Sequence, residues 1–347
     1  MNKDFDTRAQ VVKDLARVDF PGRKAVLVYD RAPARRLAGF REWKGRLHGA
    51  LALPGGEAAK DLEAFPARMA RLLELTRGLS RKEITLVALG GGSIGDFTGF
   101  AASVLKRGVD FQQIPTTWLA AVDSAHGGKT ALNAGRAKNQ VGTFHLPSRV
   151  YLVREVLLSQ PEGLAREGMV EFLKAAFLDG GEWTASLRRS RLKGGKLLWR
   201  FLPQAIRFKE RVVLRDPREE RGPRRILNLG HTLGHVLEAH HGLSHGKAVA
   251  LGLGFALRWS ETKGLLPPAA RGEMEALLEK HAFSARPEPE LPSIPARTFR
   301  RLLSLDKKAA PGGRVAFVFL RGWGLPLVRP VSPDALEEAA RKEGWVR

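Results

Sequence analysis

The chain contains residues of the kinds that bind a catalytic metal ion. His231 and His235 are four residues apart in the segment LGHTLGH, so on a helix both imidazoles would lie on one face. This spacing suits a shared site, as in H-E-x-x-H, although the intervening Glu is missing. His245 begins the next expected helix, and Glu171 precedes Lys174 by three residues, so those two side chains could face one cavity. One carboxylate and two imidazoles would fit a catalytic zinc site, and the alternative is a set of surface histidines.

A glycine-rich segment indicates phosphate binding. The apolar run 84–89 is typical of a buried parallel strand, and three glycines, 90–92, precede a helical pattern over 94–106. Glycines let the backbone approach an anion, and the free N–H groups at the helix N-terminus point towards it. The segment differs from the dinucleotide motif G-x-G-x-x-G because its acid, Asp96, lies inside the loop. We therefore expect a nucleotide or phosphate ligand, and a tight turn without a ligand is the alternative.

Other polar residues follow further expected strands. Asp30 ends the strand 24–29, where an acid often meets a ribose hydroxyl, although it could equally be a turn residue. The segment GGKT at 127–130 resembles the end of a P-loop, but the upstream G-x-x-x-x-G spacing is absent, which excludes an ATPase P-loop. Lys129 and Lys138-Asn139 remain candidate anion ligands in a glycine-rich loop.

The composition limits the class of protein. The chain has 347 residues, 44% of them apolar, which predicts two domains with sizeable cores. It has no run of 18 apolar residues and no signal-peptide core, so we expect a soluble cytoplasmic protein. Because it has no cysteine, any metal ligands must be His, Asp or Glu. The formal charge of +22 could attract nucleic acid or an anionic small molecule. The basic residues are scattered and form no nucleic-acid motif, so we expect neither a nucleic-acid nor a membrane partner.

The secondary structure expected around these residues differs between the first and second parts of the chain. The first part alternates strands and helices, which predicts an α/β nucleotide-binding domain with a parallel sheet over 1–157. The second part, 158–347, is expected to be a mainly α-helical metal- and substrate-binding domain. The expected strands are 24–29, 50–53, 84–89, 109–114 and 314–320, and the expected helices are 58–77, 94–106, 162–179, 204–215, 226–241 and 246–263.

Several segments together resemble the 3-dehydroquinate synthase family. They occur in the family's order from about Asp30 to Lys308, and their combination is more specific than any one of them. The segments are GGGSIGDFTGF (90–100), RGVDFQQIPTT (107–117), VDSAHGGKTALN (122–133), KNQVGTFHLP (138–147), GMVEFLKAA (168–176), ILNLGHTLGHVLEA (226–239), HGKAVALG (245–252) and DKK (306–308).

The resemblance implies a role for particular residues. Glu171, His231 and His245 would bind a divalent metal, zinc or cobalt, while His235 would stay off the metal, near the substrate, as a proton-transfer or hydrogen-bonding group. The NAD site would comprise Asp30, Glu57, Lys60, Gly91, Gly92, Ser93, Asp96, Thr116, Thr117, Asp123, Lys129, Lys138 and Ser159, the last where the family usually has Thr. The substrate would be held by Arg107, Lys129, Lys138, Asn139, Lys174, Lys209, Arg224, Asn228 and Lys307.

The implied reaction converts 3-deoxy-D-arabino-heptulosonate 7-phosphate into 3-dehydroquinate and phosphate. It proceeds through transient oxidation by NAD, β-elimination of phosphate, reduction and an intramolecular aldol closure. The alternatives are another sugar-phosphate cyclase, of the 2-deoxy-scyllo-inosose or epi-valiolone synthase type, and an iron-dependent or glycerol dehydrogenase. A basic nucleic-acid-binding protein would explain the charge but none of the segments. We also expect a homodimer.

Two departures from the family pattern concern the metal region. The usual HGE is HGK here, so Lys247 replaces an acid, and we expect its side chain to point away from the metal because it lies two residues beyond His245. The segment between Lys209 and His231 is one residue longer than usual, so Glu219 and Glu220 compete for one acidic position.

Overall fold

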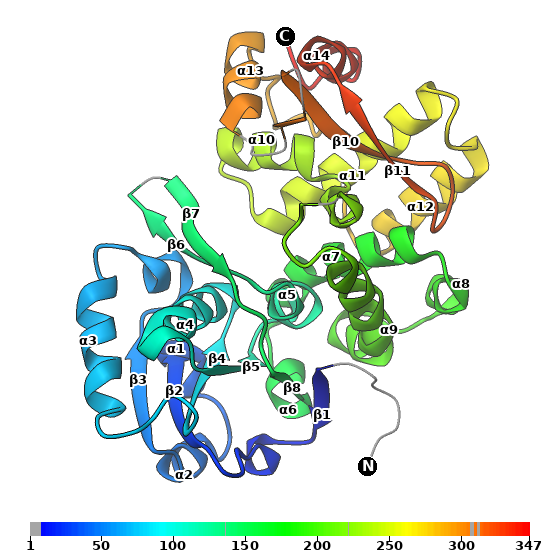
Figure 1. Ribbon diagram of the computed structural model, residues 1–347. Coiled ribbons are helices and arrows are strands. Elements are labelled where there is room, and N and C mark those ends of the chain that lie inside the picture. Colours follow the sequence, from blue (N-terminus) through cyan, green and yellow to red (C-terminus); the bar gives the residue numbers. More distant parts are fainter. Residues whose placement is uncertain (1–7, 136, 221, 306–308, 311–312) are drawn as a thin grey trace. The chain divides into compact units, whose positions relative to one another are not determined.

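The computed structural model describes residues 8–135, 137–220, 222–305, 309–310 and 313–347 (Figure 1). The chain forms two compact units. The first comprises Met1–Gly168 with Gly194–Arg218, and the second comprises Met169–Lys193 with Glu219–Arg347. Residues 194–218 pack with the first unit although they follow the predicted boundary at 157–158.

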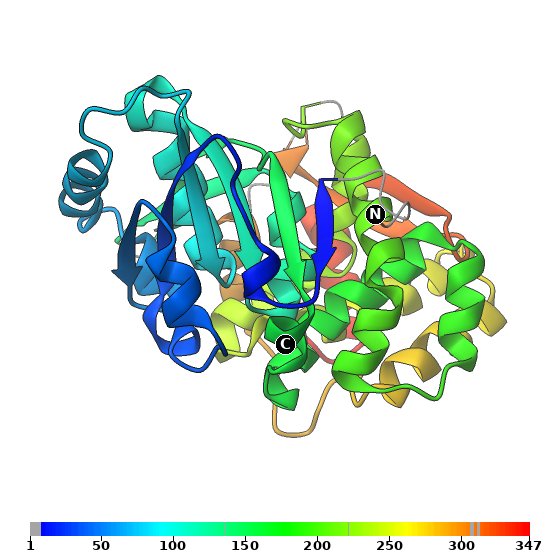
Figure 2. The same ribbon diagram turned by 90° about the horizontal axis from the view of Figure 1, so that it is seen from below.

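The first unit is built on a six-stranded parallel sheet, which Figures 1 and 2 show from two directions. Alternate residues of its inner strands point to opposite faces, so Val26 packs in one apolar core with Phe97, whereas Leu27 packs in the other with Trp43. Because both faces are covered, apolar side chains occupy the inner strands continuously, as the sequence predicts. In spatial order the strands are β1 (Ala9–Val12), β8 (Arg149–Val153), β5 (Asp110–Pro115), β4 (Ile84–Gly90), β2 (Lys24–Asp30) and β3 (Gly49–Leu53).

Helices connect these strands and cover the sheet. The helix expected over 58–77 is instead a 3-10 turn, η2 (Gly56–Lys60), followed by the helix α3 (Phe65–Leu75). A proline lies at the first positions of α3, where the missing N–H of proline costs no hydrogen bond. The remaining elements of the first unit are η1 (Leu15–Arg17), α1 (Arg31–Ala34), α2 (Phe40–Gly45), α4 (Gly92–Val104), η3 (Leu105–Arg107), α5 (Trp118–Val122), η4 (Ser124–His126), α6 (Arg154–Leu158) and α9 (Gly194–Arg215).

A β-hairpin replaces the expected glycine-rich loop around Lys129. Its strands β6 (Lys129–Ala134) and β7 (Ala137–Phe144) pair antiparallel, so the prediction of an irregular loop is wrong. The hairpin packs closely on α4, because a Cβ atom on Gly99 would lie 2.4 Å from Thr130 Cγ2. The polar residues of β7 are largely exposed, so this strand has no apolar alternation to predict it.

The second unit is mainly helical with a three-stranded antiparallel sheet, ordered β11-β10-β9. The strand expected over 314–320 is β10, and the helix expected over 226–241 is interrupted at Gly230, whose φ of 77° is left-handed. Its elements are α7 (Glu162–Asp179) from Met169 onward, α8 (Glu182–Arg189), η5 (Pro223–Asn228), α10 (His231–His241), α11 (His245–Thr262), α12 (Pro268–Lys280), α13 (Ala296–Leu305), β9 (Ala309–Ala310), β10 (Arg314–Leu320), β11 (Pro326–Val331) and α14 (Pro333–Lys342).

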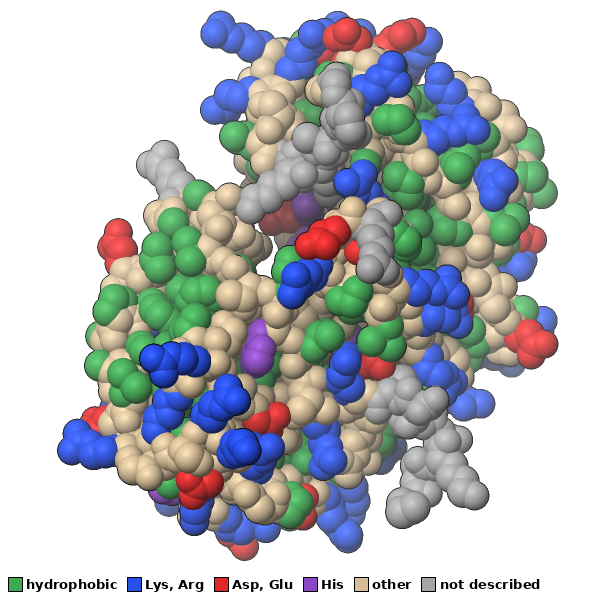
Figure 3. All heavy atoms as spheres, viewed as in Figure 1, with side chains coloured by type: hydrophobic (Ala, Val, Ile, Leu, Met, Phe, Trp, Pro, Cys, Tyr) green, Lys and Arg blue, Asp and Glu red, His purple; other side chains and the backbone are tan. Residues whose placement is uncertain are grey.

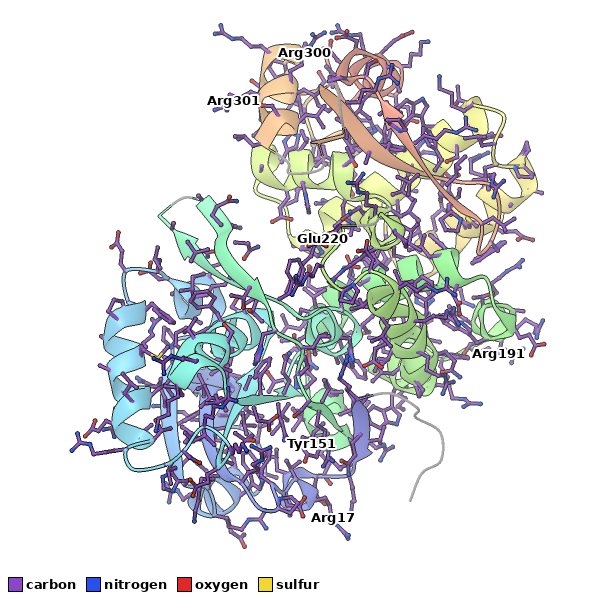
Figure 4. The ribbon with its side chains drawn as sticks, in the orientation of Figure 1. Arg17, Tyr151, Arg191, Glu220, Arg300 and Arg301 are labelled. Atoms are coloured by element: carbon purple, nitrogen blue, oxygen red, sulfur yellow. The ribbon has the colours of Figure 1, made fainter. Side chains whose placement is uncertain are left out.

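Positive charge is distributed over the surface. Figure 3 shows Lys and Arg side chains spread over the visible faces of both units without gathering into one patch. Arg17 and Arg191 lie in different parts of the chain from Arg300 and Arg301, which are neighbours on α13 (Figure 4). Among the described residues, no helix combines the length and apolar character needed to cross a membrane.

Candidate functional site

Three of the predicted metal ligands come together in the second unit. Glu171 lies on α7, His231 is the first residue of α10, and His245 is the first residue of α11. Glu171 Oε1 lies 3.3 Å from His231 Nε2 and 3.1 Å from His245 Nε2. One ligand atom from each residue lies within 4.8 Å of the others, so a single ion could contact all three. The Glu171 side chain is buried, whereas His245 keeps 31% of its side-chain exposure.

Glycines bring the two histidine-bearing helices close together. A Cβ atom on Gly252 of α11 would lie 1.9 Å from the carbonyl oxygen of Gly230, immediately before His231. A Cβ atom on Gly234 of α10 would lie 3.1 Å from the carbonyl oxygen of Ala248. Larger side chains would therefore separate α10 from α11 and, with them, the two imidazoles. These glycines position the metal group without touching it.

The other ring nitrogen of each histidine has a separate acceptor. His231 Nδ1 lies 3.1 Å from the Leu229 carbonyl oxygen, and His245 Nδ1 lies 3.3 Å from Glu238 Oε2. An acceptor at Nδ1 holds the proton there and leaves Nε2 as the coordinating atom, which is the usual arrangement around a metal-binding histidine. Glu238 was not among the residues predicted from the sequence. Its signal was available, because Glu238 follows His231 by seven residues and so shares its helix face.

Charges around Glu171 set the protonation of the group. Burial alone would raise the pKa of Glu171, but Lys174 and the two histidines hold it well below its usual range. Lys174 Nζ forms an ion pair with Glu171 Oε2, as the three-residue spacing predicts. Burial would lower the pKa of His245, but hydrogen bonds to Glu171 and Glu238 outweigh it and raise the pKa to about 10. At neutral pH the His245 ring is therefore protonated in the metal-free protein, and a metal ion would displace its Nε2 proton when it binds beside the ionised carboxylate.

The remaining predicted residues of the second unit lie near the same helices. His235 is one turn after His231, with ring centroids 5.3 Å apart, and it is outside the three-residue metal group found among the described residues. Arg224 and Asn228 lie on η5, where Arg224 is buried. Asn228 Nδ2 lies 3.5 Å from Glu219 Oε1, one of the two acids that compete for the family's acidic position. Lys307 lies outside the described residues.

Lys247 faces away from the metal group. Its Nζ atom lies 2.5 Å from Glu288 Oε2, and 44% of its side chain is exposed. The expectation that this lysine points away from the metal is confirmed, because its charge is paired with an acid outside the group. The substitution of Lys for the family's usual Glu therefore places the positive charge beside Glu288.

The first unit contains the predicted anion-binding turn. β4 ends at Gly90 and α4 begins at Gly92, so the backbone N–H groups of the first turn of α4 are oriented as expected. The glycines have different functions. A Cβ atom on Gly90 would lie 2.6 Å from the Ile94 side chain, so Gly90 allows internal packing. A Cβ atom on Gly91 would lie 3.3 Å from Thr117 Cγ2, so Gly91 keeps the space between two predicted NAD residues open.

A hydrogen-bond network connects several predicted cofactor residues. Lys60 Nζ lies 2.8 Å from Asp96 Oδ2 and 2.7 Å from Asn139 Oδ1. Ser93 Oγ donates to Glu57 Oε1 at 3.0 Å. Burial raises the pKa of Asp96, and the charge of Lys60 offsets only part of that effect. The network holds Asn139 in the left-handed conformation, with φ of 56°, which asparagine tolerates better than most residues.

Asn133 is a member of this network that was not predicted from the sequence. Its Nδ2 donates to Glu57 Oε2 at 2.8 Å, and its Oδ1 accepts from the Asn139 backbone N–H at 2.9 Å. Burial would raise the pKa of Glu57, but this hydrogen bond and Lys60 lower it. Asn133 ends the segment VDSAHGGKTALN, so the family resemblance held the signal although no role was assigned to it.

Other predicted cofactor residues make local hydrogen bonds. Asp30 Oδ1 accepts from the Ala32 N–H at 2.9 Å and so caps α1, which is the turn role the sequence left open. Thr117 caps α5 in the same way, through Ala120. The Ser159 hydroxyl donates to the Val156 carbonyl at 2.9 Å. These contacts fix the ends of strands and helices.

The predicted substrate residues of the first unit lie in different environments. Lys209 is buried on α9 and forms an ion pair with Asp123 Oδ1, while Lys129 and Lys138 are exposed on the β6–β7 hairpin. Thr116, which was predicted to line the NAD site, is buried directly after β5. Arg107 is exposed with φ of 65° and forms no hydrogen bond or ion pair in the part of the chain that the structure describes.

Known sequences and structures resemble both units. Residues 50–167 match the family described as 3-dehydroquinate synthase N-terminal, and residues 168–309 match 3-dehydroquinate synthase C-terminal. A 3-dehydroquinate synthase of Rhodospirillum rubrum is 42% identical over 296 residues, covering 82% of this chain and 75% of its own length.

Two solved structures share the fold. A 2-deoxy-scyllo-inosose synthase complexed with carbaglucose-6-phosphate, NAD+ and Co2+ has a TM-score of 0.81 and 25% identity, with 96% of each chain covered. A 2-epi-5-epi-valiolone synthase from Streptomyces hygroscopicus subsp. jinggangensis, with NAD+ and Zn2+ bound, has a TM-score of 0.80 and 23% identity, with 99% of this chain and 98% of its own covered.

Proposed function

Because the chain belongs to the 3-dehydroquinate synthase family, we propose that it converts 3-deoxy-D-arabino-heptulosonate 7-phosphate into 3-dehydroquinate and phosphate. The observation that carries this proposal is the convergence of Glu171, His231 and His245 in a chain whose first unit has glycines between β4 and the N-terminus of α4. A metal centre and a dinucleotide cradle are the two parts that a transient oxidation requires.

The donor set of the metal group fits zinc or cobalt. One carboxylate and two imidazoles leave coordination positions open for a substrate hydroxyl, as in catalytic zinc sites. The similar 2-deoxy-scyllo-inosose synthase structure contains NAD+ and Co2+, which supports the same pair here. When bound, NAD would supply reversible hydride transfer, and the metal would polarise the substrate hydroxyl.

The chain's own residues would hold the cofactor in place. The backbone N–H groups after Gly91 would hydrogen-bond the NAD pyrophosphate, and Asp30 would accept from a ribose hydroxyl. The network of Glu57, Lys60 and Asp96 would hold the loops beside that turn. In the second unit, Glu238 and the Leu229 carbonyl would orient the two imidazoles.

The cationic residues suit a substrate with two anionic groups, a carboxylate and a phosphate. Lys129, Lys138, Asn139, Lys209 and Arg107 in the first unit, and Lys174, Arg224 and Asn228 in the second, are the residues that we propose to bind it. Arg and Lys donors form charge-assisted hydrogen bonds to such oxygens. The imidazole of His235 would accept or donate the proton that moves during elimination and ring opening, because it is one helical turn beyond His231.

We also propose that the protein is a cytoplasmic homodimer. The apolar side chains of Val104 and Phe144 in the first unit are 44% and 48% exposed. Exposed apolar residues occur at subunit interfaces. Sedimentation of the parent and of a Phe144→Lys variant tests this: a monomeric parent would exclude the dimer.

The function is tested by incubating the purified protein with NAD, zinc or cobalt, and the heptulosonate phosphate. The proposal predicts equal amounts of phosphate and 3-dehydroquinate, with no net accumulation of NADH. Accumulation of NADH with simple alcohols would instead indicate a dehydrogenase. Turnover of a hexose 6-phosphate in preference to the heptulosonate phosphate would indicate another sugar-phosphate cyclase.

A further inference from the structure

Two buried titratable residues of the first unit have no role in the proposed reaction. His126 ends η4, and Glu210 lies on α9. The His126 side chain is fully buried at 0% exposure, and that of Glu210 is 6% exposed. His126 Nδ1 lies 3.0 Å from Glu210 Oε1, and His126 Nε2 lies 3.0 Å from the Ala121 carbonyl oxygen.

Both ring nitrogens of His126 therefore face oxygen atoms that accept hydrogen bonds. A neutral imidazole has one N–H and can satisfy one acceptor, while its other nitrogen would repel a carboxylate lone pair. The two hydrogen bonds form together only if the pair holds one further proton, on the ring or on the carboxyl group. In either form the pair has no net charge, which suits its burial.

This pair lies next to a second charged pair in the same unit. Glu210 follows Lys209 directly on α9, and Lys209 forms an ion pair with Asp123, three residues before His126. The His126 backbone N–H donates to the Asp123 carbonyl oxygen at 3.2 Å. Two adjacent residues of one helix thus hold one turn of chain, each through a different partner.

We propose that His126 is a positioning residue that neutralises Glu210, so that Lys209 stays paired with Asp123. This rests on the proposed function, in which Asp123 contacts NAD and Lys209 contacts substrate. Without the imidazole, Glu210 would be a buried carboxylate with no partner. Lys209 and Arg211 are the two cations adjacent to Glu210 on α9, and Lys209 is buried whereas Arg211 is exposed. A buried unpaired carboxylate would attract the buried cation strongly.

The double substitution separates this role from simple packing. His126→Leu leaves Glu210 charged and unpartnered, so Lys209 should turn from Asp123 towards Glu210. His126→Leu combined with Glu210→Leu removes both members of the pair, and replacing a buried pair by apolar residues is often neutral for stability. Lys209 should then return to Asp123. If His126 only fills space, the second substitution adds damage and repairs nothing.

The experiment measures the crystal structure, the NAD dissociation constant and the KM for the heptulosonate phosphate in both variants. We expect His126→Leu to lose the Lys209–Asp123 ion pair and to raise both constants by roughly tenfold, the loss of one hydrogen bond to a charged group. The double variant should regain the ion pair and restore both constants to within about threefold of the parent, well inside the range of a single such bond. His145→Leu is the matched control, because His145 contacts the Val109 carbonyl oxygen and, among the described residues, no carboxylate is bonded to it.

The outcomes separate this inference from the proposed function. Persistence of the Lys209–Asp123 ion pair in folded His126→Leu overturns the inference, whatever the activity. A folded double variant that is no better than the single variant also overturns it. A parent that releases no phosphate contradicts the proposed function, while the position of Lys209 in the crystal structures still tests the role of His126. If His126→Leu does not fold, the double variant and Glu210→Gln replace it. Glu210→Gln keeps both hydrogen bonds of His126 without the extra proton. Loss of the Lys209–Asp123 ion pair in folded Glu210→Gln would contradict the inference.

Discussion

Glu238 Oε2 lies 3.3 Å from His245 Nδ1, while the Nε2 atom of the same ring faces Glu171 at 3.1 Å. The imidazole is therefore held between two carboxylates, one inside the metal group and one outside it. The outer carboxylate fixes which nitrogen can bind a metal and how the ring is turned.

Glu238→Gln is predicted to weaken metal binding. The amide oxygen still accepts from Nδ1 but without a negative charge, so zinc affinity should fall by about 10-fold, at the lower end of the effect of such outer partners. Titration with a competing chelator measures this. Glu273→Gln is the control, because Glu273 pairs with Arg188 elsewhere in the second unit. Unchanged zinc affinity in Glu238→Gln would show that this contact does not orient His245.

Gly91→Val is predicted to weaken NAD binding while the fold survives. The φ of Gly91 is −77°, which any residue adopts, so the backbone is not strained. Its Cβ would lie 3.3 Å from Thr117 Cγ2, and the valine methyl groups would occupy the space in front of the helix N-terminus. Calorimetry with NAD measures the loss. Gly163→Ala, with no atom within 4 Å of its Cβ, is the control, and tight NAD binding by folded Gly91→Val would exclude the cradle.

Lys247→Glu is predicted to leave metal affinity within about tenfold of the parent, the lower edge of effects exerted through an outer partner. The new carboxylate would face Glu288, so the free energy of unfolding should fall by up to about 1 kcal/mol, as for an exposed ion pair. Adding Glu288→Lys should recover that loss. His245→Ala should weaken metal binding far more, and equal losses in Lys247→Glu and His245→Ala would show that Lys247 belongs to the metal site.

His281 is predicted to make stability depend on pH. Burial, with smaller contributions from Lys280 and Lys193, lowers its pKa to about 4 from 6.5, so the unfolded chain binds the proton more tightly than the folded protein. This contribution to stability is complete above pH 6.5 and is lost as the pH falls towards 4. The ring is partly exposed, so screening should reduce the effect to on the order of 1 kcal/mol.

Urea unfolding of the parent and of His281→Gln between pH 7 and 4 measures this contribution. Carboxylates titrate in the same range, so the difference between the two proteins isolates the histidine. The variant should lose less stability than the parent on acidification. Parallel curves would contradict the lowered pKa.

The sequence predicts several of the elements that are buried or strongly periodic, although the buried strand β8 was missed. The strand at Ile84–Gly90 and the helix at Glu162–Asp179 follow from an apolar run and from a helical pattern. The β6–β7 hairpin was missed because its second strand is largely exposed and polar. β1 was missed because it is only four residues long and its place beside β8 is a long-range pairing.

The residues of the candidate site also divide into those that the sequence predicts and those that it does not. The sequence names Glu171, His231 and His245, since their residue types and the family resemblance both point to metal binding. It does not name Glu238 or Asn133, whose contacts depend on how the chain folds back on itself. His126 and Glu210 are 84 residues apart, and no spacing pattern connects them.

Phosphate release from 3-deoxy-D-arabino-heptulosonate 7-phosphate by metal-depleted protein, before and after addition of zinc or cobalt, tests the central claim most directly. With NAD present throughout, we predict no release from the metal-depleted protein and full release once the metal is restored, whereas a Glu171→Ala variant should stay inactive in both conditions. Full release by protein that elemental analysis shows to be free of metal would contradict the account.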